Sequence, residues 1–195
     1  RDLAVLEDDP YGMGRYEGER PPWLIELEGG ERVSFTSSFS KTVAPGLRVG
    51  YVVATEELRA AYEDRAVSTY ISPPLLPQAI VYELHASGRF EPNLDRIRDL
   101  LRLRRDTMLD ALENELPEGV TWNRPEGGYF LWVELGERDA AEVQRRAAEA
   151  GLTFVRGSDF FPAGDDRGAS SARFAFSFET PERIREGVAI LASVV

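Results

Sequence analysis

The chain has 195 residues, a formal charge of −11 and 43% hydrophobic residues, which is the composition of a folded globular protein. Its acidic balance argues against nucleic-acid or anionic-membrane binding by this segment, and no apolar run is long enough for a membrane span. The absence of cysteine excludes disulfides and thiolate metal sites, and the single histidine, His85, is expected to be non-catalytic. The first residues do not resemble a signal peptide, so we expect a cytoplasmic protein.

Strands and helices alternate in the first part of the chain. Strands are expected at 3–6, 32–37 and 49–54, and helices at 56–66 and 75–86. Thr55 is a good N-cap for the first of these helices. The run at 49–54 is continuously apolar, so that strand is expected to be buried on both faces. Three strands are few for an open α/β sheet, and the first part is therefore expected to be an incomplete sheet.

The second part of the chain begins with its longest helical pattern, over 93–116. The arginines of this helix alternate with acids and are expected to form a solvated face; they are Arg96, Arg98, Arg102, Arg104 and Arg105. Strands are expected at 120–122, 129–133, 152–155 and 173–178, and helices at 139–150 and from 181, the last one capped by Thr180. The sequence therefore predicts an α/β first part and an α+β second part.

One lysine, Lys41, stands among 23 basic residues, and the other 22 are arginine. Arginine is effectively never deprotonated, whereas a lysine amine can become neutral and form a Schiff base with a carbonyl. The count alone leaves open that Lys41 merely escaped a compositional bias. Its surroundings are S-S-F-S-K-T-V-A-P-G-L-R-V-G over 37–50, a loop between two predicted strands. Hydroxyls at 38, 40 and 42, together with Arg48, could hold a phosphate there.

This loop resembles the fold-type I pyridoxal-phosphate (PLP) aminotransferases of class I/II, in which S-x-S-K-x-x-x-P-G-x-R-x-G carries the lysine that binds PLP. The resemblance implies that Lys41 is the catalytic lysine, covalently bound to PLP. It also implies that Ser38 and Arg48 hold the cofactor phosphate, with Ser40 beside them in the cofactor site. The Ala-Pro-Gly turn looks like the 2-aminoadipate, kynurenine and broad-specificity subgroup. The aminotransferase-like domain of GntR-type regulators is similar too.

Two further landmarks lie outside this loop. Asp8 stands three residues before Tyr11, as in the family's D-x-x-Y motif. The resemblance implies that Asp8 pairs with the pyridine nitrogen of PLP and that Tyr11 binds the phenolic oxygen; Asp9 is the rival to Asp8. Arg173 matches the family's arginine for the substrate α-carboxylate, a task that suits a forked guanidinium.

Two glycine-containing segments also fit the resemblance. The segment P-E-G-G-Y-F-L-W over 125–132 resembles the family's P-x-G-G-x-F-L-W, and 157–160 resembles its G-x-x-F turn. The implied fold is aspartate aminotransferase-like, with 1–92 as the C-terminal part of the PLP-binding large domain and 93–195 as the small domain. The resemblance covers only the C-terminal half of the family's length.

The implied activity is PLP-dependent transfer of an amino group between an amino acid and a 2-oxo acid, in a homodimer when complete. No metal site is expected. The motifs do not identify which amino acid is the substrate. Two alternatives remain open. One is a PLP-binding sensor domain of a GntR-type transcription regulator, and the other is a structural fragment that does not bind PLP. Such a fragment is expected to expose a large apolar patch.

Overall fold

The computed structural model describes residues 3–195. The chain divides into two compact units, residues 1–98 and 99–195, and helix α4 (Phe90–Glu115) contributes residues to both. Within the described residues, no helix combines the length and apolarity that a membrane crossing requires.

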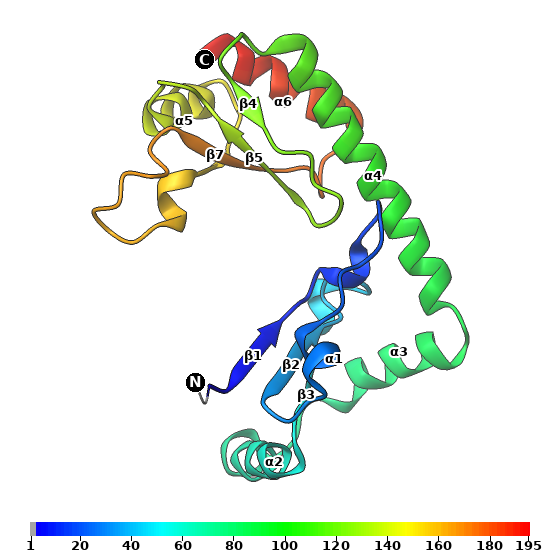
Figure 1. The fold of residues 1–195 in the computed structure, drawn as a ribbon. Helices are drawn as coiled ribbons and strands as arrows, with labels where there is room; N and C mark the ends of the chain where they lie inside the picture. Colours follow the sequence, from blue (N-terminus) through cyan, green and yellow to red (C-terminus); the bar gives the residue numbers. More distant parts are fainter. Residues whose placement is uncertain (1–2) are drawn as a thin grey trace. The chain divides into compact units, whose positions relative to one another are not determined.

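The first unit is built on a three-stranded sheet in the order β1-β2-β3 (Figure 1). Its strands are β1 (Val5–Asp8), β2 (Val33–Ser38) and β3 (Gly50–Val53). β1 runs parallel to β2, with Asp8 opposite Thr36, whereas β3 is antiparallel to β2. Because β1 and β2 are parallel, their carboxyl ends share one edge of the sheet. The loops that follow these two strands therefore begin side by side.

The prediction that β3 is buried on both faces is wrong. Val52 and Val53 are about half exposed, and β3 forms an edge of the sheet in the described part of the chain. A continuous apolar run is buried on both faces only where other elements cover both faces of the strand. Residues 3–195 do not provide that cover.

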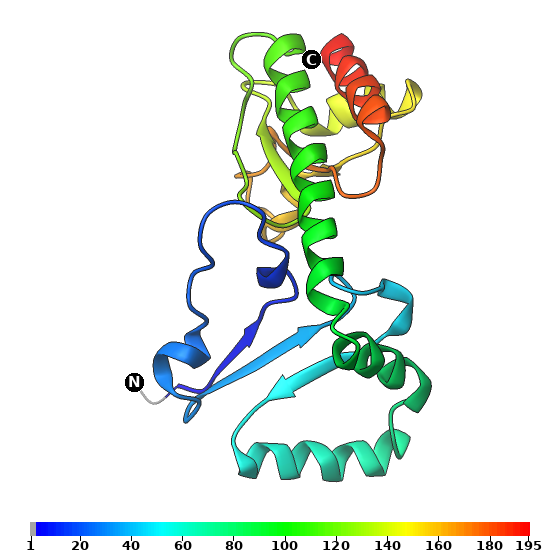
Figure 2. The same ribbon diagram turned by 90° about the vertical axis from the view of Figure 1, so that its right-hand side faces the viewer.

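The helices of this unit are α1 (Leu24–Glu28), α2 (Glu56–Tyr70) and α3 (Leu75–Ala86). The side chain of Thr55 accepts a hydrogen bond from the backbone N–H of Leu58, so the predicted N-cap is confirmed. α2 continues four residues beyond the predicted end, and none of its residues is buried. Figure 2 shows α2 at the outside of the unit. Leu75, Leu76 and Tyr82 on α3 are exposed as well.

The second unit contains an antiparallel sheet in the order β4-β5-β7-β6. Its strands are β4 (Thr121–Trp122), β5 (Phe130–Glu134), β6 (Val155–Arg156) and β7 (Ser171–Ala175). β6 is shorter and later than predicted, and β7 begins two residues before the predicted strand. The helices are α5 (Ala140–Glu149) and α6 (Pro181–Val194), and α6 lies beside the C-terminal part of α4 (Figures 1 and 2).

The solvated face predicted for α4 is wrong at Arg105, whose side chain is only 1% exposed. Its Nε donates a hydrogen bond to Oδ1 of Asp106 at 2.8 Å, and Nη1 donates to the carbonyl oxygen of Pro125, also at 2.8 Å. The turn before β5 thus brings a backbone acceptor against the helix. A buried guanidinium is tolerated where such acceptors satisfy it.

Candidate functional site

The two acidic residues at the end of β1 lie in different environments. Oδ1 of Asp9 accepts hydrogen bonds from the backbone N–H groups of Tyr11 (3.0 Å) and Gly12 (2.7 Å), and Oδ2 accepts one from Nε1 of Trp23 (2.7 Å). Asp8 is exposed at the same strand end. The geometry therefore makes Asp9 a structural residue that fixes the turn after β1, and leaves Asp8 as the more accessible acid.

The turn carrying Tyr11 is held from two sides. A Cβ on Gly12 would lie 2.0 Å from Oδ2 of Asp9, so only glycine allows the carboxylate to approach this closely. On the other side, Nε and Nη2 of Arg98 donate hydrogen bonds to the carbonyl oxygen of Met13 at 3.1 and 2.9 Å. Sequence reasoning missed these positioning roles. An acid followed by Gly three residues later gave a local signal for the turn, but nothing in the sequence pointed to Arg98.

Trp23, which donates a hydrogen bond to Asp9, packs against the sheet. The centroid of its ring lies 4.9 Å from that of Phe35 on β2, and the guanidinium carbon of Arg20 lies 3.7 Å from the Trp23 centroid. Arg20 also donates a hydrogen bond to Glu26 at 2.9 Å, which lowers the pKa of the Glu26 carboxyl. The end of β1 is thus tied through Asp9 and Trp23 to the sheet.

The loop after β2 carries Lys41 and starts beside the end of β1. Oγ of Ser37 donates to the carbonyl oxygen of Asp9 at 2.9 Å, which joins the two strand ends. Nζ of Lys41 lies 5.6 Å from the ring centroid of Tyr11. Nδ2 of Asn93 donates to the carbonyl oxygen of Thr42 at 2.9 Å and holds the loop against α4. The structure therefore brings Lys41 close to Tyr11, which lies 30 positions earlier in the sequence.

The rest of this loop gathers hydroxyl and guanidinium donors. Nη1 of Arg48 donates to Oγ of Ser40 at 3.4 Å, and the backbone N–H of Ser40 lies 3.4 Å from Oγ of Ser38. Arg48 has φ 54°, in the left-handed region, at the end of the short 3₁₀ turn Pro45–Leu47. The hydroxyl of Thr42 is buried and has no hydrogen-bond partner. Hydroxyls beside an arginine are a donor set that fits an oxyanion such as phosphate.

Arg173 belongs to the second unit, on β7. Its guanidinium carbon lies 4.0 Å from the ring centroid of Phe130 and 4.5 Å from that of Phe160. Nε of Arg173 is buried and makes no hydrogen bond. The cofactor residues predicted from the sequence thus lie in the first unit, and the predicted carboxylate-binding arginine lies in the second.

A family model described as "Aminotransferase class I and II" matches residues 1–191. The chain belongs to this family. The 2-aminoadipate transaminase of Thermus thermophilus is 38% identical over 192 residues, which are 96% of this chain and 48% of that protein. An HTH-type transcriptional regulator of Bacillus subtilis is 29% identical over 188 residues, which are 95% of this chain and 38% of the regulator.

Solved aminotransferase structures share the fold. Kynurenine aminotransferase from Pyrococcus horikoshii, in complex with PMP, has a TM-score of 0.91 at 34% identity, over 99% of this chain and 48% of that one. α-Aminoadipate aminotransferase from Thermus thermophilus, complexed with N-(5'-phosphopyridoxyl)-L-leucine, has a TM-score of 0.89 at 37% identity, over 98% and 50%. The predicted aspartate aminotransferase-like fold is confirmed. The chain spans about half the length of these aminotransferases.

Proposed function

We propose that the whole protein is a PLP-dependent aminotransferase, in which 1–92 belong to the cofactor-binding large domain and 93–195 form the small domain. The observation that carries the proposal is the edge of the first sheet, where the only lysine of the chain lies 5.6 Å from the Tyr11 ring. The family match and the pyridoxyl group in the Thermus thermophilus structure support PLP as the cofactor.

The chemistry of the residues fits the parts of PLP. Ser38, Ser40 and Arg48 supply hydroxyl and guanidinium donors for its phosphate. Asp8 supplies a carboxylate for the pyridine nitrogen, and Lys41 supplies an amine for covalent attachment. When bound, PLP offers a protonated ring that accepts the electron pair left by loss of the substrate α-proton.

The remaining work falls to side chains of this chain. Nζ of Lys41 would take the α-proton of the amino acid as general base and return a proton as general acid. The Tyr11 hydroxyl would donate a hydrogen bond to the phenolic oxygen of the cofactor. Arg173 would bind the substrate carboxylate and so orient the α-carbon. We further propose that the whole protein acts in amino acid metabolism as a cytoplasmic homodimer.

A second candidate function is the cofactor-binding sensor domain of a GntR-type regulator. The similarity to the Bacillus subtilis regulator favours it, because that match also covers nearly all of this chain. The two functions differ in turnover. An aminotransferase converts an amino acid to a 2-oxo acid, whereas a sensor binds the cofactor and ligand without releasing an oxo acid.

The decisive experiment is the intact mass of the chain after incubation with PLP and reduction with borohydride. Lys41 carries the only side-chain amine in the sequence, so one pyridoxyl addition located on the peptide containing residue 41 is expected. Lys41→Arg keeps the charge but cannot form the adduct, because a guanidinium is not deprotonated. Peptide mapping distinguishes a pyridoxyl group on Lys41 from one on the α-amine of the chain.

The outcomes divide the candidates. An adduct on Lys41 that Lys41→Arg abolishes supports the cofactor role, and α-deuterium exchange with oxo-acid production then distinguishes enzyme from sensor. If the adduct is absent from a chain extended to the full length of the relatives, the proposal is wrong.

A further inference from the structure

Arg173 is unusual among the arginines of the second unit because aromatic rings, and not carboxylates, surround its guanidinium. The rings are those of Phe130 on β5 and Phe160 in the short turn after β6, at 4.0 and 4.5 Å from the guanidinium carbon. Within residues 3–195, no carboxylate lies in ion-pair distance of Arg173. We call Phe130 and Phe160 the aromatic clamp.

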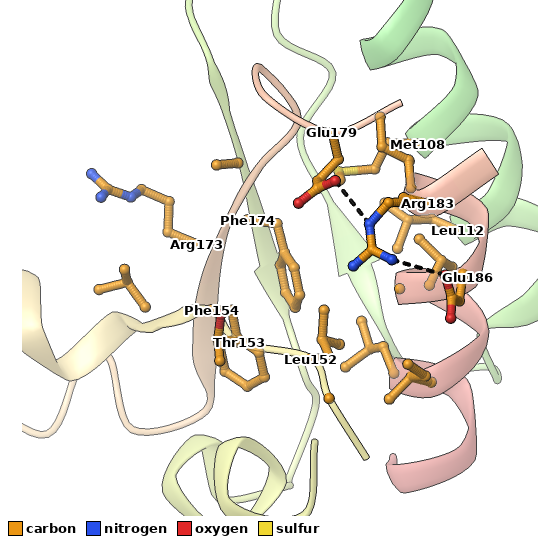
Figure 3. A pocket seen from close by; sticks show the side chains of 18 of the residues that line it. Met108, Leu112, Leu152, Thr153, Phe154, Arg173, Phe174, Glu179, Arg183 and Glu186 are labelled. Carbon is orange, nitrogen blue, oxygen red and sulfur yellow. Dashed lines mark hydrogen bonds and ion pairs between the residues drawn. The ribbon is translucent and has the colours of Figure 1, made fainter. Parts of the chain in front are cut away.

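The register of the sheet places these groups together. Arg173 lies opposite Trp132, and Phe130 lies opposite Ala175, so the four side chains share one face of β5 and β7. The alternate residues Ala172 and Phe174 on β7 are buried on the other face. In Figure 3 the Arg173 side chain correspondingly extends to the opposite side of β7 from Phe174.

The glycine of the predicted G-x-x-F turn brings Phe160 to this face. A Cβ on Gly157 would lie 2.6 Å from Cβ of Ser171 and 2.8 Å from the carbonyl oxygen of Gly168. Glycine at 157 therefore lets the turn Gly157–Phe160 lie directly against the start of β7. The ring of Phe160 also meets Trp132 edge-on, with centroids 5.5 Å apart.

Two neighbouring arginines show what Arg173 lacks. Arg156 has a buried Nε without a partner, as Arg173 does, but its Nη2 pairs with Asp159 at 3.0 Å. Arg183, on α6, is one of the residues that line a cavity of about 570 Å³. Its guanidinium pairs with Glu179 and Glu186 at 3.0 and 3.5 Å (Figure 3). Both guanidinium groups are therefore already neutralised by carboxylates, whereas that of Arg173 is not.

We propose that the aromatic clamp positions Arg173 for a carboxylate ligand, so that Phe130 and Phe160 are positioning residues for substrate binding. Phenyl rings attract the cation without neutralising it, and Nε is buried without an acceptor. The terminal nitrogens are then the donors that remain for an anion, and a carboxylate accepts from two such donors at once. The inference rests on the proposed role of Arg173 and extends it to residues that do not touch the ligand carboxylate.

The test is NMR titration of the ¹⁵N-labelled chain with 3-phenylpropanoate, monitored at the Nε–H resonance of Arg173. The amide 3-phenylpropanamide, which lacks the charge, controls for apolar contact alone. Phe160→Leu and Phe130→Leu are each expected to weaken binding by roughly three- to tenfold and to reduce the ring-current shift of the Nε–H, because one ring of the clamp remains in each variant. Phe160→Tyr keeps a ring face and is expected to restore both. Phe160 is 44% exposed, so the fold is expected to survive its replacement.

Matched controls separate this proposal from the proposed function. Phe178→Leu replaces a phenyl ring that is 86% exposed, and Arg183→Gln removes an arginine that is already paired; neither is expected to change the affinity. If Arg173→Gln abolishes binding while both Phe→Leu variants bind like the unmodified chain, the clamp is wrong and the role of Arg173 stands. If Arg173→Gln binds normally, or the unmodified chain does not bind, the carboxylate role and the clamp both fail. The test of Lys41 is independent of either result.

Discussion

The two units have nearly equal lengths but bury their apolar side chains to very different extents. Of the 26 buried apolar residues, 20 lie in residues 99–195 and six in residues 3–98. Among residues 3–195, 16 of the 20 large apolar residues that are exposed lie in the first unit. The second unit closes a core between its own sheet and helices, whereas the first presents apolar faces that its own elements do not cover. This difference agrees with a chain that spans about half the length of its aminotransferase relatives.

The proposed site residues are held differently in the two units. In the first unit, the loops that carry Tyr11 and Lys41 are fixed by hydrogen bonds that the Asp9 carboxylate accepts and that Arg98 and Asn93 donate. In the second unit, strand register and packed rings fix Arg173. Polar contacts can thus order an edge of a sheet even where few apolar side chains are buried around it. Each unit is therefore expected to respond to a different kind of substitution.

The largest contrast is expected for core leucines. Leu191 on α6 is 0% exposed and Leu76 on α3 is 73% exposed. Leu191→Ala is expected to lower the free energy of unfolding of its unit by about 2–5 kcal/mol, because it leaves a cavity in a closed core. Leu76→Ala is expected to change stability by less than about 0.5 kcal/mol. Urea unfolding monitored by residue-specific NMR signals in each unit measures both. Equal losses for the two variants would show that the apolar side chains of α3 are covered in solution.

The next effect is expected at Asp9. Asp9→Ala removes the acceptor of three N–H groups and is expected to destabilise the end of β1 by about 1–3 kcal/mol. Gly12→Ala is expected to act similarly, because its Cβ would displace the Asp9 carboxylate. Asp8→Ala is the matched control and is expected to leave stability within about 0.5 kcal/mol. The hydrogen-exchange rates of the Tyr11 and Gly12 amides measure the effect. Equal rates in all variants would contradict the prediction.

Much of the architecture could be predicted from local sequence patterns. The caps at Thr55 and Thr180 are confirmed because N-capping depends on residues only three positions apart. The predictions of a buried β3 and of a solvated Arg105 were wrong because exposure depends on contacts from distant segments. The carbonyl oxygen of Pro125 reaches Arg105 across 20 positions, and the cover that β3 needs does not come from residues 3–195. The roles of Asp9, Trp23 and Arg98 also rest on pairings of this long-range kind.

A smaller effect is expected on the exposed apolar surface of the first unit. Leu75→Gln and Leu76→Gln replace exposed leucines on α3 and are expected to reduce binding of a dye that fluoresces on apolar surfaces, with little change in stability. Leu100→Gln and Leu103→Gln, which replace exposed leucines of the second unit, serve as the comparison and are expected to reduce it less. Dye fluorescence at matched protein concentration measures the difference. Equal reductions from the two pairs would mean that the apolar surface is not concentrated in the first unit.

The smallest effect is expected on the loss of stability at low pH, to which a single carboxylate contributes. The Glu28 carboxylate accepts backbone hydrogen bonds from Arg32 and Val33 at the start of β2, and the Arg32 bond in particular lowers its pKa below the ordinary 4.5. A depressed pKa in the folded state means that the stabilisation is present above pH 4.5 and is lost as the pH falls through the folded value. Glu28→Gln is therefore expected to flatten the acid-side decline in stability of the first unit, whereas Glu31→Gln, an exposed acid in the same turn, is not. The urea midpoint measured across this pH range decides between them. An unchanged slope in Glu28→Gln would mean that these backbone contacts do not join α1 to the sheet in solution.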